Sequence, residues 1–214
     1  MKKKIELSAY EQNNQIASEN RQFFYKNGIF ALNIIGSPGC GKTSILEYTA
    51  SKFDRSFGVI IGDVKTALDS NRIIEAGNNF SYPIETGGGC HISPKMLSEK
   101  IKEINKNIDF LFIENVGNLV CPSSFDLGEQ FKVAVLSIPE GDEKVRKYPS
   151  LFLKAEAVII NKIDLLDFMD YDIDRVVEDC KTHNPKAEIF KTSTKTGKGF
   201  TEWFEFLIEK RKYF

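Results

Sequence analysis

Short, mostly apolar runs recur along the chain and alternate with longer amphipathic or polar stretches. The runs lie at 30–35, 58–62, 110–113, 133–136 and 157–160. Because apolar residues follow one another instead of alternating with polar ones, each run predicts a parallel strand covered on both faces. Helical patterns occupy the stretches between them, at roughly 66–77, 93–106, 172–183 and 199–212. This alternation predicts an α/β fold: a doubly wound, mostly parallel sheet with helices on both faces.

The chain is long enough for one substantial core and does not require a second. It has 214 residues, of which 42% are hydrophobic. Residues 8–26 form a polar, moderately amphipathic stretch that predicts a helix leading into the first strand. We therefore expect an N-terminal helical extension over 1–27, followed by a single domain over 28–214.

The first predicted strand runs directly into a phosphate-binding motif. Residues 36–43 read GSPGCGKT, a full match to G-x-x-x-x-G-K-[ST], and a helical stretch follows. Backbone N–H groups of such a loop and the positive end of the following helix bind phosphate oxygens. The motif predicts a P-loop NTPase in which Lys42 contacts the β- and γ-phosphates and the Thr43 hydroxyl ligates Mg²⁺. The residues expected around the phosphates are Gly36, Ser37, Pro38, Gly39, Cys40, Gly41, Lys42, Thr43 and Ser44.

A second motif indicates which base is bound. Asn161-Lys162-Ile163-Asp164 follows the run 157–160 and has the form N-K-x-D. A carboxylate at Asp164 can accept hydrogen bonds from two donors of guanine, a pair that adenine does not offer. Asn161 can support the loop, and the aliphatic part of Lys162 can lie along the base. Downstream, Ser193, Thr194 and Lys195 end another short strand and can present backbone amides to the guanine oxygen. The predicted substrate is GTP.

Two carboxylates at predicted strand ends suit Mg²⁺ coordination. Asp63 follows the run 58–62, and Glu114 follows the run 110–113. Glu114 opens an E-N-V-G segment that is similar to the D-x-x-G switch of GTPases, with Gly117 as the expected γ-phosphate sensor. Either carboxylate could instead cap a helix or lie in a solvated loop. We expect Lys42, Thr43, Asp63, Glu114 and Gly117 to form the catalytic set.

Cysteine and histidine residues flank the switch segment. Cys90 and His91 follow a run of three glycines, and Cys121 lies four residues after Gly117. Thiolate and imidazole groups suit Ni²⁺ and Zn²⁺. Three ligands do not complete a tetrahedral site, but two chains related by a two-fold axis would supply six. A single cysteine is more often a small buried hydrophobe.

Charge and cysteine content exclude several classes of protein. Lys and Arg number 29 against 30 Asp and Glu, for a net charge of -1, which argues against nucleic acid or a membrane surface as a partner. No apolar run approaches the roughly 20 residues that span a bilayer. The four cysteines are too few for a disulfide framework. We expect a cytoplasmic protein.

Taken together, these segments resemble the hydrogenase nickel-incorporation GTPase family, HypB. The resemblance extends from about residue 30 to the C-terminus. Its most specific parts are GGGCH (87–91), FIENVGNLVCP (112–122), FDLG (125–128) and EGD (140–142).

The resemblance implies a GTPase that forms a homodimer with nucleotide. Its partners would be a nickel metallochaperone of the maturation pathway and the [NiFe]-hydrogenase large-subunit precursor. Cys90, His91 and Cys121 would form a shared interfacial Ni²⁺ or Zn²⁺ site, and Lys147 would reach the partner chain's nucleotide. Many bacterial members carry an N-terminal Cys-rich or His-rich nickel motif, which residues 1–39 do not contain. High-affinity nickel storage at this N-terminus is therefore not expected.

Three alternatives are weaker. The related urease-accessory GTPases carry a Cys-Pro-His motif and lack the E-N-V-G-N segment, whereas Cys90 and His91 are adjacent here. A P-loop small-molecule kinase would use ATP, which the N-K-x-D motif disfavours. A non-enzymatic metal-binding protein would not need the complete phosphate loop.

Overall fold

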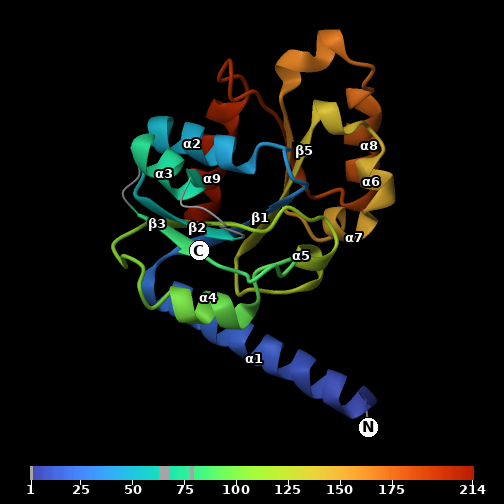
Figure 1. Ribbon diagram of the computed structural model, residues 1–214. Coiled ribbons are helices and arrows are strands. Elements are labelled where there is room, and N and C mark those ends of the chain that lie inside the picture. The colour runs from blue at the N-terminus through green and yellow to red at the C-terminus, as the bar shows by residue number, and fades with distance from the viewer. Residues whose placement is uncertain (1, 63–67, 78–79) are drawn as a thin grey trace.

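The centre of the molecule is a fully parallel β-sheet. The computed structural model describes residues 2–62, 68–77 and 80–214, and in them seven strands pair in the order β3-β2-β4-β1-β5-β6-β7 (Figure 1). The strands are β1 (Phe30–Gly36), β2 (Phe57–Gly62), β3 (Ser81–Ile84), β4 (Phe110–Glu114), β5 (Phe131–Ser137), β6 (Ala157–Asn161) and β7 (Glu188–Lys191). The predicted doubly wound α/β fold is confirmed.

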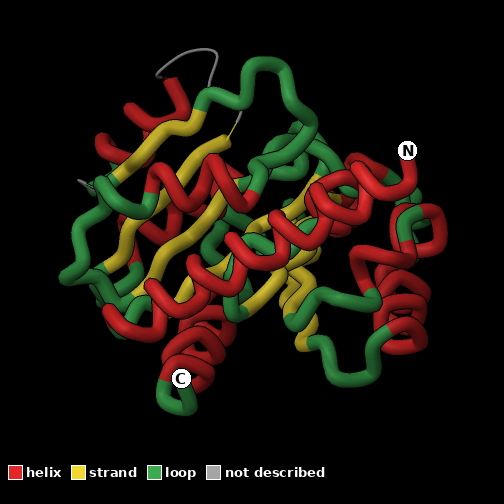
Figure 2. The backbone as a smooth tube through the Cα atoms, turned by 90° about the horizontal axis from the view of Figure 1, so that it is seen from below, coloured by secondary structure: helices red, strands yellow, loops and turns green. Residues whose placement is uncertain are grey.

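Helices connect the strands and cover both faces of the sheet (Figures 1 and 2). The α-helices are α1 (Lys2–Asn27), α2 (Lys42–Lys52), α3 (Leu68–Glu75), α4 (Pro94–Lys100), α5 (Cys121–Ser124), α6 (Lys144–Lys147), α7 (Pro149–Phe152), α8 (Ile173–His183) and α9 (Phe200–Arg211). Two short 3₁₀ helices, η1 (Ile138–Glu140) and η2 (Ile163–Phe168), follow β5 and β6.

The central strands are mostly apolar because each contributes to a core on either side. In β1, Leu32 and Ile34 pack in a cluster with residues of α2 and α9, including Trp203. The intervening Ala31 and Ile35 point the other way and belong to separate clusters. Successive side chains of a strand face opposite sides, so burial on both faces requires a continuous apolar run.

Helix α1 crosses one face of the sheet, and its C-terminal half is anchored there (Figure 2). Ala17, Asn20 and Phe24 are buried at helical spacing. The Asn20 amide donates to the carbonyls of Pro94 and Leu127 at 3.1 and 3.0 Å. The helix ends at Asn27, where the extension was expected to end. The C-terminal half of the helix contributes Phe24 to a core cluster of the domain. The division into an extension and a domain therefore stays a prediction.

The five strands predicted from apolar runs are present, β7 is the short strand expected before Ser193, and the helix predicted over 93–106 is shorter than expected. Helix α4 ends at Lys100, and turns follow. Asn105 supplies a physical reason for the absence of helix at the end of this stretch. Its backbone N–H donates to the Tyr82 hydroxyl at 2.8 Å, and its side-chain oxygen accepts from the Asn107 N–H at 2.9 Å. These bonds compete with helical ones. Helix α3 is described from Leu68 onward, so the start expected at 66 lies outside the described residues.

The structure also bears on membrane association. Within the described ranges, no helix combines the length and the apolar character needed to cross a bilayer.

Candidate functional site

The phosphate-binding motif forms a tight turn between β1 and α2. Gly39 and Gly41 have φ values of 77° and 99°, a region that other residues rarely adopt. A Cβ atom on Gly41 would lie 2.4 Å from the Asn161 amide nitrogen. Glycine is therefore required at position 41 both for backbone conformation and for space. The Asn161 amide donates to the Cys40 carbonyl at 3.2 Å, which ties the loop to the end of β6.

Side chains of this motif converge with the end of β4. The Lys42 ammonium is buried and donates to the carbonyls of Gly36 and Ser37 at 3.1 and 3.2 Å. The Thr43 hydroxyl donates to Glu114 Oε1 at 2.8 Å. The two groups expected to share Mg²⁺ thus lie in direct contact. Asp63, the other expected Mg²⁺ ligand, lies outside the described residues.

The segment after Glu114 lies against the phosphate loop. A Cβ atom on Gly117 would lie 2.8 Å from Pro38 Cγ and 3.0 Å from Pro38 N, so only glycine permits this approach. A pocket of about 390 Å³ lies between the phosphate loop and residues 114–117. Its lining residues are Pro38, Gly39, Gly41, Lys42, Thr43, Ser44, Gly62, Arg72, Glu114, Asn115, Gly117 and Lys162.

The residues predicted to bind guanine gather beside the same loop. Lys162 has a left-handed backbone (φ 62°), and its ammonium donates to the Gly39 carbonyl at 2.7 Å. The Ser193 hydroxyl donates to Asp164 Oδ1 at 2.5 Å, so the Asp164 carboxylate faces the loop that begins with Thr192. Asn161 is fully buried and also accepts a hydrogen bond from the Thr192 hydroxyl at 3.3 Å. Thr194 is half-buried and Lys195 exposed on that loop.

Cys90, His91 and Cys121 form a cluster. One ligand atom from each lies within 4.8 Å of the other two. Positive φ values at Gly87 and Gly88 (62° and 84°) turn the chain ahead of Cys90, and Cys121 begins α5. Two soft thiols and an imidazole suit Ni²⁺ or Zn²⁺, and their spacing fits one ion.

The cluster also shows perturbed acidities. A hydrogen bond with the Cys121 thiol raises the pKa of Cys90 above its ordinary value. Partial burial lowers the pKa of His91, which favours the neutral imidazole that binds metals. The thiol of Cys40, in the phosphate loop, lies in the core, and burial raises its pKa to about 11. Cys40 therefore differs from the two cysteines of the cluster in being a buried, protonated thiol.

Two contacts of the cluster were not anticipated from the sequence. The Phe125 ring stacks on the His91 ring, with centroids 4.2 Å apart and planes at 7°. The side-chain oxygen of Asn115 accepts from the N–H of Ile92, the residue after His91, at 3.0 Å. Asn115 therefore contacts the loop that carries Cys90 and His91 while lying between Glu114 and Gly117. The sequence offered one signal of this buried polar contact: Asn33 is the one polar residue in the run 30–35. In the structure its side-chain oxygen accepts from the Asn115 amide at 3.0 Å.

Lys147 is not among the residues that line the phosphate pocket. Its side chain is 63% exposed and pairs with Glu143 at 2.6 Å.

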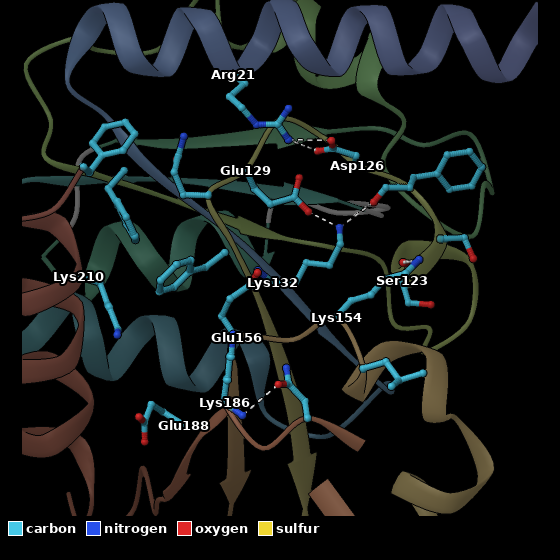
Figure 3. A pocket seen from close by; sticks show the side chains of 18 of the residues that line it. Arg21, Ser123, Asp126, Glu129, Lys132, Lys154, Glu156, Lys186, Glu188 and Lys210 are labelled. Atoms are coloured by element: carbon cyan, nitrogen blue, oxygen red, sulfur yellow. Dashed lines mark hydrogen bonds and ion pairs between the residues drawn. The ribbon is translucent and has the colours of Figure 1, made fainter. Parts of the chain in front are cut away.

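A larger cavity of about 1130 Å³ lies beside the residues that begin β1, β5 and β7, at the amino-terminal ends of the strands, whereas the phosphate loop follows the carboxyl end of β1. Figure 3 shows this cavity, with Arg21 facing Asp126 and Lys132 facing Glu129. None of the predicted site residues lines it.

Comparison with known proteins identifies the family. Residues 30–191 match the family described as CobW/HypB/UreG, nucleotide-binding domain. The hydrogenase/urease maturation factor HypB of Helicobacter pylori strain J99 is 39% identical over 214 residues, which cover 98% of this chain and 88% of that protein. The chain belongs to the HypB family. The hydrogenase maturation factor HypB of Escherichia coli K12 is also 39% identical, over 97% of this chain and 72% of that one.

A solved HypB structure has the same fold. The crystal structure of Helicobacter pylori HypB in complex with nickel superimposes with a TM-score of 0.90 at 39% identity, over 94% of this chain and 96% of that chain. The resemblance to HypB seen in the sequence motifs is therefore confirmed. The P-loop NTPase fold is confirmed as well, since the chain matches HypB structures over nearly its whole length.

Proposed function

We propose that this HypB-family protein is a GTPase that binds GTP with Mg²⁺, holds a Ni²⁺ or Zn²⁺ ion, and assists nickel insertion into [NiFe]-hydrogenase during its maturation. One observation carries the proposal. Cys121 lies four residues after Gly117, whose backbone lies against the phosphate loop, and its thiol gathers with Cys90 and His91 into a cluster of two thiols and an imidazole. One segment, residues 114–121, thus contributes side chains or backbone both to the phosphate pocket and to the soft-ligand cluster.

The catalytic roles follow from the contacts at the end of β4. The Lys42 ammonium, held by two loop carbonyls, would transfer its hydrogen bonds to phosphate oxygens. Thr43 and Glu114, already in contact, would hold Mg²⁺ with Asp63. When bound, the ion neutralises charge on the β- and γ-phosphates. The Gly117 N–H would report the presence of the γ-phosphate to the residues that follow.

Guanine selectivity would depend on Asp164. The Ser193 hydroxyl occupies Oδ1 and fixes the orientation of the carboxylate. Lys162 and Asn161 brace the neighbouring phosphate loop at two adjacent carbonyls, those of Gly39 and Cys40. Backbone groups of Ser193, Thr194 and Lys195 would complete the base pocket.

Nickel would be cargo, and its site would lie between two chains. Cys90, His91 and Cys121 leave an ion with fewer than four protein ligands, so a second copy is the natural source of the rest. The same homodimer would bring the exposed Lys147 to the partner's nucleotide. Because the exposed Val120 adjoins Cys121, apolar surface is available beside the metal ligands.

The proposed partners are those of a nickel-insertion pathway. A nickel metallochaperone would exchange metal with the cluster, and the hydrogenase large-subunit precursor would receive it, both in the cytoplasm. The name of the Helicobacter pylori relative also includes urease, which favours urease as a second client of that pathway.

Two assays test the function. The wild type should hydrolyse GTP, and not ATP, without an added phosphate acceptor. Lys42→Ala and Thr43→Ala should each abolish most of this activity, because they remove a phosphate contact and a Mg²⁺ ligand. A Cys90→Ala/Cys121→Ala variant should lose Ni²⁺ and Zn²⁺ binding while retaining GTP binding. Equal hydrolysis of ATP and GTP, or unchanged metal stoichiometry in the double variant, would refute the proposal.

A further inference from the structure

The buried side-chain amide of Asn115 joins the nucleotide segment to the loop that carries Cys90 and His91. Asn115 Oδ1 accepts from two backbone groups, the N–H of Ile92 and the N–H of Val116, each at 3.0 Å. Ile92 directly follows the ligand His91, whereas Val116 precedes Gly117. The same oxygen therefore bonds to both segments.

Asn115 is held rigidly between the groups expected to contact nucleotide. It follows Glu114, which bonds to Thr43, and it lines the phosphate pocket. Its own N–H donates to the Ile34 carbonyl in β1 at 3.0 Å. The residue is only 2% exposed, so water cannot replace a bond that it loses.

A buried polar chain fixes the orientation of this amide. The Asn115 nitrogen donates to Asn33 Oδ1 at 3.0 Å, and the Asn33 nitrogen donates to Glu129 Oε1 at 3.2 Å. Glu129 in turn pairs with Lys132, as Figure 3 shows. Because Glu129 can only accept at this point, Asn33 must present its nitrogen to Glu129 and its oxygen to Asn115. The Asn115 oxygen is thereby directed at Ile92.

The far end of this hydrogen-bonded series, Lys132, leads back to His91 through Phe125. The Lys132 ammonium donates to the Phe125 carbonyl at 2.7 Å. The Phe125 ring stacks on His91. His91 is thus braced at its backbone through Asn115 and at its ring through Phe125, and of these two residues Asn115 lies on the nucleotide segment. The exposed Asn118 adds a longer contact from that segment, 3.5 Å to the Cys90 carbonyl.

We propose that Asn115 is the positioning residue that couples nucleotide state to metal affinity in this chain. The inference rests on the proposed function. Any shift of residues 114–117 toward the γ-phosphate must either carry the Ile92 N–H with it, and so reposition His91, or break a buried hydrogen bond. Coupling between two such sites typically changes affinity by about 5- to 150-fold.

The alternative is that Asn115 only satisfies buried backbone groups. In that case its removal would lower stability, or metal affinity, by the same factor in every nucleotide state. Phe125→Leu provides a matched control, because it removes a contact to His91 without touching residues 114–117.

The test is the ratio of Ni²⁺ dissociation constants measured by titration with GDP bound and with a non-hydrolysable GTP analogue bound. The wild type should give a ratio of about 5 or more, in either direction. Asn115→Ala should move the ratio toward one, although Cys121 and the Asn118–Cys90 contact keep the two segments linked. Phe125→Leu should weaken Ni²⁺ binding in both states and leave the ratio as in the wild type.

A second variant covers the case in which Asn115→Ala does not fold. Asn33→Ala keeps Asn115 but removes the acceptor that orients its amide, so the ratio should fall in the same direction. The inference is overturned if folded Asn115→Ala or Asn33→Ala has the same ratio as the wild type. It is also overturned if the wild type itself has a ratio of one. The proposed function is tested separately, by GTP hydrolysis and by metal stoichiometry.

Discussion

The Thr43 hydroxyl donates a 2.8 Å hydrogen bond to Glu114 Oε1. The two residues lie 71 positions apart, one at the start of α2 and the other at the end of β4. Parallel pairing of β1 with β4 places both at the carboxyl edge of the sheet, where ligands of open α/β folds bind. The contact supports a shared Mg²⁺ role for these residues.

Glu114→Gln should lower GTP hydrolysis by about 10²-fold or more, because the charge that would hold Mg²⁺ beside the phosphates is lost. The measurement is single-turnover phosphate release at saturating GTP and Mg²⁺. Asp109→Asn is the matched control: Asp109 lies just before the opposite end of β4 and pairs with Arg211 at 2.6 Å. If the two variants hydrolyse GTP equally fast, Glu114 does not act at the active site.

Asp164→Asn should weaken GTP binding by about 1–3 kcal/mol, since a buried donor pair on guanine would lose its acceptor. Binding of a xanthine nucleotide should improve, because its hydrogen-bonding pattern matches the amide. Dissociation constants from calorimetry decide this. Asp167→Asn, an exposed carboxylate in the same 3₁₀ helix, should leave both affinities unchanged. A wild type that binds ATP as tightly as GTP would disprove base selection by Asp164.

Only two of the four cysteines should react rapidly with iodoacetamide in the folded protein. Burial raises the pKa of Cys40 to about 11 and of Cys180 to about 12. Both thiols are also buried, so the reagent does not reach them, and they stay protonated until the pH approaches those values.

Cys90 is exposed and Cys121 half-exposed, so mass spectrometry at mildly alkaline pH should find label there, and Ni²⁺ or Zn²⁺ should prevent it. Labelling of all four at similar rates, or no protection by metal, would contradict the site.

Gly128→Ala should destabilise the protein by loosening α1. Gly128 has a φ of 93°, and an added Cβ would lie 2.5 Å from the Ala17 carbonyl and 2.7 Å from the Arg21 N–H. Overpacking of this kind typically costs about 1–3 kcal/mol.

Gly141→Ala is the control for backbone strain alone, because Gly141 has a similar φ of 79° and no atom within 4 Å. Denaturant unfolding should show the larger loss for Gly128→Ala, together with faster tryptic cleavage near Lys26. Equal losses would mean that the close approach to α1 does not matter.

The central strands were predictable because both of their faces are buried. The edge strands were less so. β3 and β7 lie at the two ends of the sheet, and β3 contains Pro83. An edge strand is only partly covered and can accommodate proline, so it lacks the continuous apolar run that indicates a central strand.

The predicted site residues were found from short motifs, whereas the contacts that orient them join distant positions. Asn33 and Asn115 are 82 residues apart, and Asn33 and Glu129 are 96 residues apart. A sequence shows a polar residue within an apolar strand but not the partner that satisfies it. The same holds for Phe125, whose stacking on His91 depends on the folded loops.

The most direct test of a nucleotide-controlled metal site is a reciprocal titration of the wild type. Ni²⁺ affinity is measured with GDP and with a non-hydrolysable GTP analogue, and the affinity of each nucleotide is then measured with and without Ni²⁺. Linkage requires that metal change the relative affinity of the two nucleotides by the same factor by which they change metal affinity. We expect equal factors of about 5 or more. Identical Ni²⁺ affinities in the two states would reduce the metal to a structural role and contradict the account.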